Sequence, residues 1–201
     1  MHDRPVAAAA TRNADPILEV LRHEFRNSTD VLEIGSGTGQ HAIHFAASLD
    51  HLQWQTSDLE ENHPAIRAWI ADARLPNVRE PIALDVTTAD LSTSYDAVYS
   101  ANTAHIMSID EVARMFALAA RVLRPDGLFC LYGPFRRFGQ FNTDSNARFD
   151  ASLRARDPSM GIRDLEELDA MAATDGLHRQ NLYAVPSNNL VVIWKKTTTA
   201  Q

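Results

Sequence analysis

A glycine-rich turn between a predicted strand and a predicted helix constrains the fold of this 201-residue chain more than any other feature. The β-rich run 30–34 stops at Gly35, and a helical pattern with apolar residues in phase covers 40–49. Gly35, Gly37 and Gly39 let the chain turn with positive φ and let a ligand lie against bare backbone. In a doubly wound α/β sheet, such a turn lies beyond the carboxyl ends of the strands, where ligands bind.

The rest of the chain continues the alternation of strands and helices. Four further β-rich runs, separated by amphipathic patterns, lie at 52–58, 82–86, 95–100 and 128–132. Two closing runs, 179–185 and 190–196, are joined by four residues and must therefore be antiparallel neighbours. Five strands interleaved with helices predict a parallel sheet covered on both faces. We expect an α/β, Rossmann-like, seven-stranded, mostly parallel sheet that ends in an antiparallel hairpin strand.

The length predicts a single domain over 1–201, since this chain is too short for two sizeable cores. Within it we expect an N-terminal lid and helix at 1–29, and a substrate-side insert at 133–163, where the alternation stops. Asp15 suits the N-cap of the first helix and Pro16 its first position, because a missing N–H costs nothing there.

Composition narrows the classes of partner. With 19 Lys and Arg against 26 Asp and Glu, the net charge of -7 argues against nucleic acid. The single cysteine, Cys130, cannot form an intramolecular disulfide, which indicates a reducing, cytoplasmic location. We expect no membrane partner, because no run approaches the ~20 apolar residues of a span. We expect no metal, because His41 and His44 have no third ligand at a recognisable spacing.

The residue before the turn bears on the charge of the ligand. Glu33 would repel the pyrophosphate of a dinucleotide, and it would favour a cationic or amine-bearing ligand. The dinucleotide fingerprint G-x-G-x-x-G also requires glycine where this chain has Gln40. The sequence therefore favours a positively charged ligand over a dinucleotide.

Polar residues follow the next three predicted strands. Asp58 ends the second strand and is placed to accept both hydroxyls of a ribose. Asp85 and Val86 end the third strand, where an acid or amide can hold the exocyclic amine of adenine, and Asn102 follows the fourth. Together with the turn, these residues predict a nucleoside site at one edge of the sheet.

This pattern resembles the class I S-adenosylmethionine-dependent methyltransferases. In that family the acid-x-G-x-G-x-G turn binds the amino acid part of the cofactor, the acid after strand two binds the ribose, and residues after strand three bind the adenine. The resemblance implies S-adenosylmethionine as cofactor. The cofactor-binding residues that it implies are Glu33, Gly35, Ser36, Gly37, Gly39, Asp58, Leu59, Asp85, Val86 and Asn102.

A narrower resemblance runs nearly from end to end. The segments 12–18, 32–41, 54–58, 132–135 and 161–164 are similar to the DUF938 family, also called methyltransferase-like 26. That family is described as methyltransferases largely without an assigned substrate. Gly35 departs from the alanine expected in many members and returns the turn to the general methyltransferase pattern. We also expect Arg12 and Asn13 to loop back over the cofactor and to bind its carboxylate.

Candidates for the acceptor side lie after strands four and five. His105 is the candidate general base, since its ordinary pKa lies near neutrality. Arg154 and Arg163 are the candidate contacts to an anionic acceptor. The other candidate substrate residues are Tyr132, Phe135, Asn146 and Asp150.

The predicted activity is methyl transfer to a small molecule, preferably to the oxygen of an acidic or hydroxylated metabolite. The nitrogen-acceptor signature N/D-P-P-Y/F is absent, because Asn102 is followed by Thr103. Two alternatives stay open: an NAD-dependent oxidoreductase, and a non-catalytic cofactor-binding subunit that supports a partner. The sequence does not determine the oligomeric state.

Overall fold

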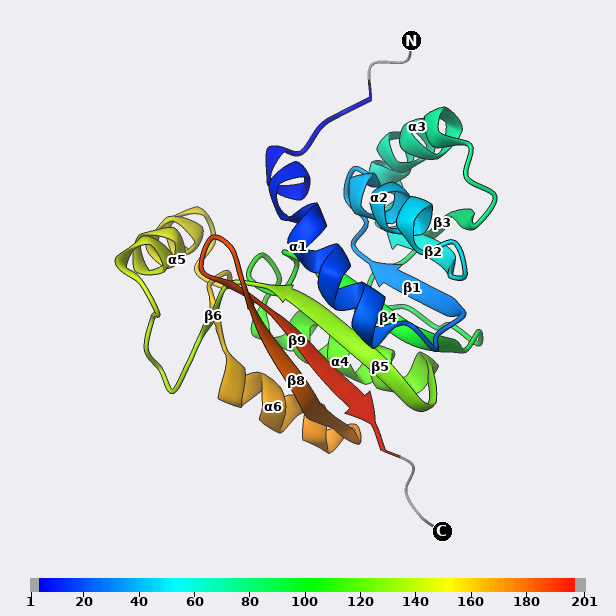
Figure 1. Cartoon of the computed structure of the whole chain (residues 1–201). Helices are drawn as coiled ribbons and strands as arrows, with labels where there is room; N and C mark the ends of the chain where they lie inside the picture. Colours follow the sequence, from blue (N-terminus) through cyan, green and yellow to red (C-terminus); the bar gives the residue numbers. More distant parts are fainter. Residues whose placement is uncertain (1–3, 198–201) are drawn as a thin grey trace.

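The computed structural model describes residues 4–197, so residues 1–3 and 198–201 of the predicted domain and lid lie outside the described residues. The strands of its main sheet are β1 (Asp30–Ile34), β2 (Gln53–Asp58), β3 (Val78–Ala83), β4 (Tyr95–Ala101), β5 (Leu123–Gly133), β8 (Leu177–Val185) and β9 (Asn189–Lys196). Their order is β3-β2-β1-β4-β5-β9-β8 (Figure 1). The first five strands are parallel, and β9 is antiparallel to both β5 and β8. The predicted fold class is therefore confirmed.

Helices cover both faces of this sheet (Figure 1). The helices are α1 (Ala8–Glu24), α2 (Gln40–Ser48), α3 (His63–Ala73), α4 (Ile109–Val122), α5 (Asp144–Arg156) and α6 (Leu165–Thr174), with a 3-10 turn, η1, at Glu60–Asn62. The helices α1, α2 and α3 cover one face, and α4 and α6 cover the other. In residues 4–197 no helix combines the length and apolar character that crossing a membrane requires.

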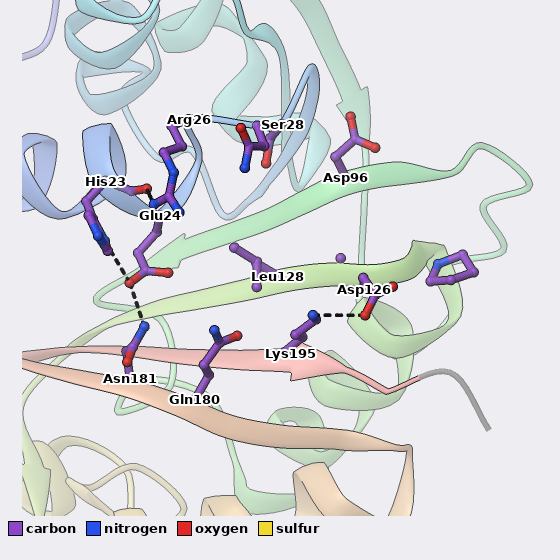
Figure 2. Close-up of a pocket in the computed structure, with 13 residues that line it drawn as sticks. His23, Glu24, Arg26, Ser28, Asp96, Asp126, Leu128, Gln180, Asn181 and Lys195 are labelled. Carbon is purple, nitrogen blue, oxygen red and sulfur yellow. Dashed lines mark hydrogen bonds and ion pairs between the residues drawn. The ribbon is translucent and has the colours of Figure 1, made fainter. Parts of the chain in front are cut away.

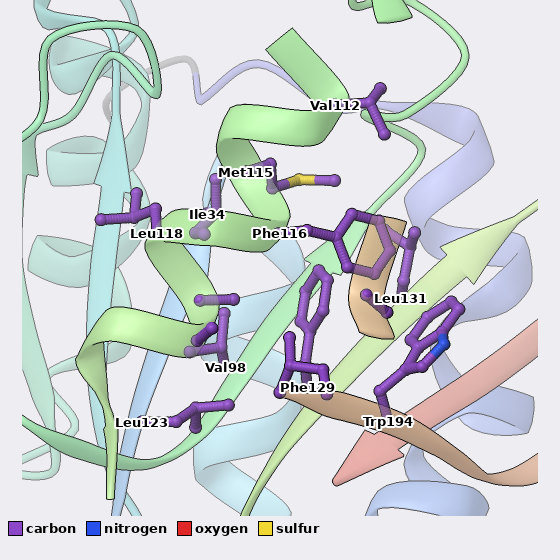
Figure 3. Packing of buried hydrophobic residues seen from close by; sticks show 14 of the residues in the cluster. Ile34, Val98, Val112, Met115, Phe116, Leu118, Leu123, Phe129, Leu131 and Trp194 are labelled. Carbon is purple, nitrogen blue, oxygen red and sulfur yellow. The ribbon is translucent and has the colours of Figure 1, made fainter. Parts of the chain in front are cut away.

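Each face of the sheet has its own aromatic core. On the α4 face, the ring centroid of Phe116 lies 5.1 Å from that of Phe129 and 5.1 Å from that of Trp194 (Figure 3). The centroids of Phe129 and Trp194 lie 5.8 Å apart. On the other face, Trp54 and Tyr99 pack with their ring centroids 5.7 Å apart. Apolar side chains project from both faces of the sheet and pack against the helices on each side. The central strands are therefore almost wholly buried, as expected of a parallel sheet.

The first helix begins earlier than its sequence predicts. It starts at Ala8, so Asp15 is not its N-cap and Pro16 lies inside the helix. The alanines at 8–10 are strong helix formers. Tertiary contacts hold this early start in place, since Trp69 Nε1 donates to the carbonyl of Pro5 at 2.8 Å.

Two predicted strands are also shifted. The third covers Val78–Ala83 rather than 82–86, which moves Asp85 and Val86 into the loop beyond its carboxyl end. Pro81 cannot donate to a ladder, and it is tolerated because β3 is an edge strand. The fifth strand starts at Leu123 rather than at 128, and its pairing with β4 is irregular between Leu123 and Leu128.

The insert after β5 forms a small unit of its own beside the carboxyl ends of the parallel strands (Figure 1). It contains α5 and a two-stranded parallel sheet of β6 (Phe135–Arg136) and β7 (Arg163–Asp164). The side chain of Thr143 accepts a hydrogen bond from Asn146 N and caps α5. The insert therefore lies at the same end of the sheet as the turn after β1.

Candidate functional site

The turn after β1 requires glycine at two positions for steric reasons. Gly35 has φ +74°, and a Cβ added there would lie 2.7 Å from Thr103 Cγ2. Gly39 has φ +89°, and its added Cβ would lie 3.1 Å from the backbone of Ile66. At Gly37 the added Cβ meets nothing within 4 Å, so this backbone faces open space. The turn thus presents bare backbone to a ligand, as its sequence predicts.

A cavity of about 440 Å³ lies against this turn, at the carboxyl ends of the parallel strands. This volume falls within the range of about 300–1,000 Å³ that is common for small-molecule sites. The structure brings together seven of the predicted cofactor residues in its lining: Gly35, Gly37, Asp58, Leu59, Asp85, Val86 and Asn102.

The charge of this cavity is one-sided. Its lining holds the carboxyl groups of Asp58, Asp85 and Glu111. No lysine or arginine of the described residues, 4–197, lines this cavity. Hydrogen bonds from the Thr87 side chain and backbone lower the pKa of Asp85. Such a lining attracts a cationic ligand and opposes a pyrophosphate.

Asp58 holds the turn and keeps capacity for a ligand. Its Oδ2 accepts from Gly37 N at 2.7 Å, and its Oδ1 accepts from Leu59 N and Asn62 Nδ2, both at 2.8 Å. A carboxylate has about four acceptor sites, so one site stays free, and a second becomes free when the Asn62 side chain turns away.

Glu33 lies behind the turn and not in the lining of the cavity. Its Oε2 accepts from Ser36 Oγ at 2.8 Å and from Trp54 Nε1 at 3.0 Å, and the residue is 2% exposed. Burial raises the pKa of Glu33 to about 7. Ser36 Oγ also accepts from Ser57 N at 3.1 Å. Glu33 and Ser36 therefore shape the turn from beneath, and Gly39 caps α2.

Arg12 and Asn13 lie over the same edge of the sheet but line a separate cavity. This second cavity measures about 80 Å³, lies between α1 and the β8–β9 turn, and also includes Asn102, Tyr132 and Asn189 in its lining. Asn102 belongs to both cavities. The expected contact of Arg12 and Asn13 with the cofactor carboxylate stays a prediction.

His105 directly precedes Ile106, which lines the larger cavity, but does not itself line it; its ring packs against the insert. Its ring makes an edge contact with Phe149, with the ring centroids 5.3 Å apart, and its Nδ1 lies 3.9 Å from where a Cβ on Gly133 would be. Burial, followed by the charges of Arg163 and Arg156, lowers the pKa of His105 to about 4. The imidazole is therefore neutral at physiological pH.

The predicted substrate residues of the insert are engaged within the fold. Arg163 donates to the carbonyl oxygens of Ala104 at 2.9 Å, of Ser159 at 2.8 Å and of Met107. Arg154 Nε donates to Asp150 Oδ2 at 2.8 Å, and Asp150 Oδ1 accepts from Ile162 N at 2.7 Å. Asn146 donates to Asn142 Oδ1 at 2.7 Å, while Phe135 is 2% exposed. These side chains hold the insert together, and Arg163 also ties it to the segment between β4 and α4.

Sequence reasoning missed several residues of the larger cavity. Glu111 reads as the second half of a capping box, and it does accept from Ser108 N at 2.6 Å. Only the fold shows that this first turn of α4 faces the site. Ile106 lines the cavity although it is 45% exposed, and exposed apolar side chains in a loop carry no distinctive signal.

Another cavity, of about 450 Å³, lies at the opposite end of the sheet (Figure 2). Several of its polar groups bond to one another: Lys195 Nζ lies 2.9 Å from Asp126 Oδ1, and Asn181 donates to Glu24 Oε1 at 2.8 Å. It lies at the amino ends of the parallel strands, away from the glycine turn, and ligands of such sheets bind at the carboxyl ends. Residues 4–197 contain no group of three potential metal ligands.

Three solved structures with this fold are methyltransferases by their titles. An O-methyltransferase family protein from Burkholderia thailandensis matches with a TM-score of 0.83 at 16% identity, over 96% of this chain and 58% of that protein. The mitomycin 7-O-methyltransferase MmcR matches with a TM-score of 0.82 at 14% identity, over 94% of this chain and 56% of that protein. Human N-acetylserotonin methyltransferase, in complex with S-adenosylmethionine, matches with a TM-score of 0.80 at 11% identity, over 94% of this chain and 53% of that protein.

This chain thus spans a little more than half the length of these three proteins. At such identities the likeness shows a shared fold. A family model described as a protein of unknown function, DUF938, matches residues 4–196, which is nearly the whole chain and confirms the family predicted from the motifs. The chain belongs to the DUF938 family.

Proposed function

We propose that this protein is an S-adenosylmethionine-dependent methyltransferase that acts on a small molecule, with the oxygen of an acidic or hydroxylated metabolite as acceptor. The observation that carries the proposal is the acidic cavity beyond the glycine turn. A sulfonium and an ammonium group are favoured among the carboxyl groups of Asp58, Asp85 and Glu111, whereas a dinucleotide would bring two further negative charges.

The residues present fit the cofactor part by part. Asp58 has acceptor capacity for the ribose hydroxyls. Asp85 lies in the loop after β3, where its carboxylate can accept from the exocyclic amine of adenine. Leu59 and Ile106 are both 45% exposed, and a bound adenine would bury these side chains. When bound, the cofactor supplies an activated methyl group.

The fold supports the same conclusion. Structures of this fold include two proteins titled O-methyltransferases and a methyltransferase in complex with S-adenosylmethionine. The preference for oxygen as acceptor also agrees with the lack of the nitrogen-acceptor signature after β4. The net charge of -7 favours a small molecule over a nucleic acid.

The protein's own part in the transfer is to align the acceptor, exclude water and receive a proton. Phe149, which belongs to the insert, packs against the ring of His105. The neutral imidazole of His105 can accept a proton from an acceptor hydroxyl, although its low pKa makes it a weak base. An anionic acceptor beside the ring would raise this pKa and strengthen the base.

We expect His105→Gln to slow methyl transfer about tenfold. This is less than the usual general-base effect of about 10²–10⁴, because the pKa of about 4 leaves His105 a weak base. Transfer of labelled methyl into a metabolite extract measures the rate, and titration with S-adenosylhomocysteine measures binding, which should be unchanged. An unchanged rate with unchanged binding would remove His105 from the reaction.

The function itself is tested by calorimetric titration of the protein with S-adenosylmethionine and, separately, with NADH. We expect micromolar binding of the sulfonium cofactor and none of NADH. The opposite result would make the protein an NAD-dependent oxidoreductase. Cofactor binding without any labelled product in a metabolite extract would favour the non-catalytic, partner-supporting role.

A further inference from the structure

We propose that the cavity of about 450 Å³ at the amino ends of the parallel strands binds the ammonium group of a small alkylamine, with the carboxylate of Glu24 as its acceptor. This amino-end cavity shares no lining residue with the cavity assigned to the cofactor. The proposal therefore concerns a second ligand and does not rest on the proposed function. The volume falls within the range of about 300–1,000 Å³ that is common for small-molecule sites.

Glu24 occupies a position of α1 that faces the core. It follows Ile17 and Leu21 on the helix face that packs against the sheet, and both of these residues are fully buried. Glu24 itself is only 9% exposed. A carboxylate buried to this extent costs free energy unless partners bond to it. The oxygens of Glu24 therefore need donors.

The two oxygens of this carboxylate have different surroundings. Oε1 accepts from Asn181 Nδ2 at 2.8 Å and from the hydroxyl of Tyr183, and it lies 3.3 Å from His23 Nδ1. Oε2 has no hydrogen-bond or ion-pair partner in the described part of the chain. Figure 2 shows this second oxygen turned away from Asn181 and His23. The contacts of Oε1 thus hold the carboxylate in one orientation, with Oε2 as an acceptor open to the cavity.

A β-bulge in β8 turns Asn181 toward Glu24. Arg179 and Asn181 pair with consecutive residues of β9, so Gln180 is the extra residue. Arg179 points to the other face of the sheet, where its guanidinium lies 3.3 Å from the carboxylate of Asp169 on α6. Residues two apart in a regular strand share a face, so without the bulge Asn181 would also point toward α6. The bulge therefore supplies a donor that orients Glu24, and bulges serve to re-aim side chains next to active sites.

The other charged groups of the lining are engaged elsewhere. Both oxygens of Asp96 accept hydrogen bonds from groups outside the cavity. Asp126 pairs with Lys195 at 2.9 Å, and Arg26 Nη1 donates to a backbone carbonyl of α1 at 2.7 Å. Among residues 4–197, no lysine or arginine forms an ion pair with Glu24. A cation supplied by a ligand would complement this carboxylate.

A single open oxygen selects among cations. A guanidinium bonds a carboxylate through two parallel hydrogen bonds and so requires both oxygens. A metal ion requires several ligands, and residues 4–197 hold no group of three potential metal ligands. An ammonium group is a compact charge that can donate to one oxygen. The partly buried side chain of Leu128, which also lines the cavity, offers an apolar contact to the carbon chain of the amine.

NMR titration of the full, ¹⁵N-labelled chain with n-butylammonium tests the site, with n-butanol as the neutral control and butyrate as the anionic one. We expect n-butylammonium to shift the side-chain amide of Asn181 and the backbone amide of Gly127 until saturation, and the two controls to leave both in place. An equal response to n-butanol, a preference for butyrate, or no response to n-butylammonium would overturn the proposal.

Two variants assign the binding to Glu24. Glu24→Gln keeps an oxygen that can accept from Asn181 and Tyr183 but carries no charge, so n-butylammonium affinity should fall about tenfold or more. Gln180→Lys places a tethered ammonium group at an exposed position of the lining and should cause a similar fall. Glu19→Gln, at an exposed position of the same helix, is the matched control.

Unchanged n-butylammonium affinity in a folded Glu24→Gln protein, or in Gln180→Lys, would overturn the assignment to Glu24. Both variants should bind S-adenosylhomocysteine as the wild type does, because the two cavities lie at opposite ends of the sheet. A wild type that binds n-butylammonium but no adenosyl ligand would leave this site standing and remove the proposed function. The reverse pattern would remove only the ammonium site.

Discussion

Replacing Asp58 by alanine is expected to weaken S-adenosylhomocysteine binding at least 100-fold. The substitution removes the acceptor for the ribose hydroxyls, and each charge-assisted hydrogen bond contributes about 1.5–3 kcal/mol. It also removes the acceptor of Gly37 N, which Asp58 Oδ2 holds at 2.7 Å, so the turn loses its fixed geometry. Calorimetric titration measures the affinity directly.

Two further variants make this result specific. Asp58→Asn keeps one carbonyl oxygen and should give an intermediate loss. Glu61→Ala removes an exposed carboxyl three residues away that does not line the cavity, so it should leave the affinity within twofold. Unchanged affinity in a folded Asp58→Ala protein would contradict both the ribose contact and the proposed cofactor.

Glu33→Gln is expected to stabilise the protein at pH 8 by about 3 kcal/mol. Burial raises the pKa of Glu33 from 4.5 to about 7, so at pH 8 the fold must bury a charged carboxylate. One pKa unit corresponds to about 1.36 kcal/mol. Glutamine keeps an oxygen that can accept from Trp54 Nε1 and Ser36 Oγ, and it carries no charge.

The pH dependence of this effect has a definite sign. Between pH 4.5 and about 7, the folded state retains the Glu33 proton that the unfolded chain releases. The free energy of unfolding of the wild type therefore falls as the pH rises through this window. The gain from Glu33→Gln should be near zero at pH 4 and reach its full size above about pH 7.

Urea unfolding at pH 4, 6 and 8 measures this difference, and Glu19→Gln, at an exposed site on α1, is the control. A Glu33→Gln protein that is less stable than wild type at pH 8 would show that the ionised carboxylate is favoured in the fold.

Titration of the same variant with S-adenosylhomocysteine measures whether Glu33 contributes to ligand binding. We expect little change, because Glu33 lies beneath the turn and outside the lining of the cavity.

The adenosyl half of the candidate site was predictable from the sequence. Strand ends in a parallel sheet meet at one edge, so residues directly after β1, β2, β3 and β4 must lie together. This reasoning placed Gly37, Asp58 and Asp85 in one cavity even though the bounds of β3 were wrong by several residues. A wrong prediction of where a strand begins and ends by a few residues does not change the edge of the sheet at which its carboxyl end lies.

The acceptor half was less predictable, because its residues come from segments without a periodic pattern. Arg154 and Arg163 have the chemistry for an anion contact, but the insert directs them to Asp150 and to backbone carbonyls. Arg12 has the same chemistry, and the structure leaves its guanidinium beside a cavity. Which arginine is available depends on neighbours distant in sequence.

The sequence by itself determined the fold class and the glycine turn, since these follow from local periodicity and from the backbone conformations that glycine permits. The family followed from the resemblance of its motifs, which the family model confirms. Only the tertiary structure decided where the charges lie. It buried Glu33 against Trp54, turned Glu111 toward the cavity, and brought Arg12 to Asn102 and Tyr132 across the sheet. The physical reason is that the environment of a charge is set by packing between distant segments, which no local pattern encodes.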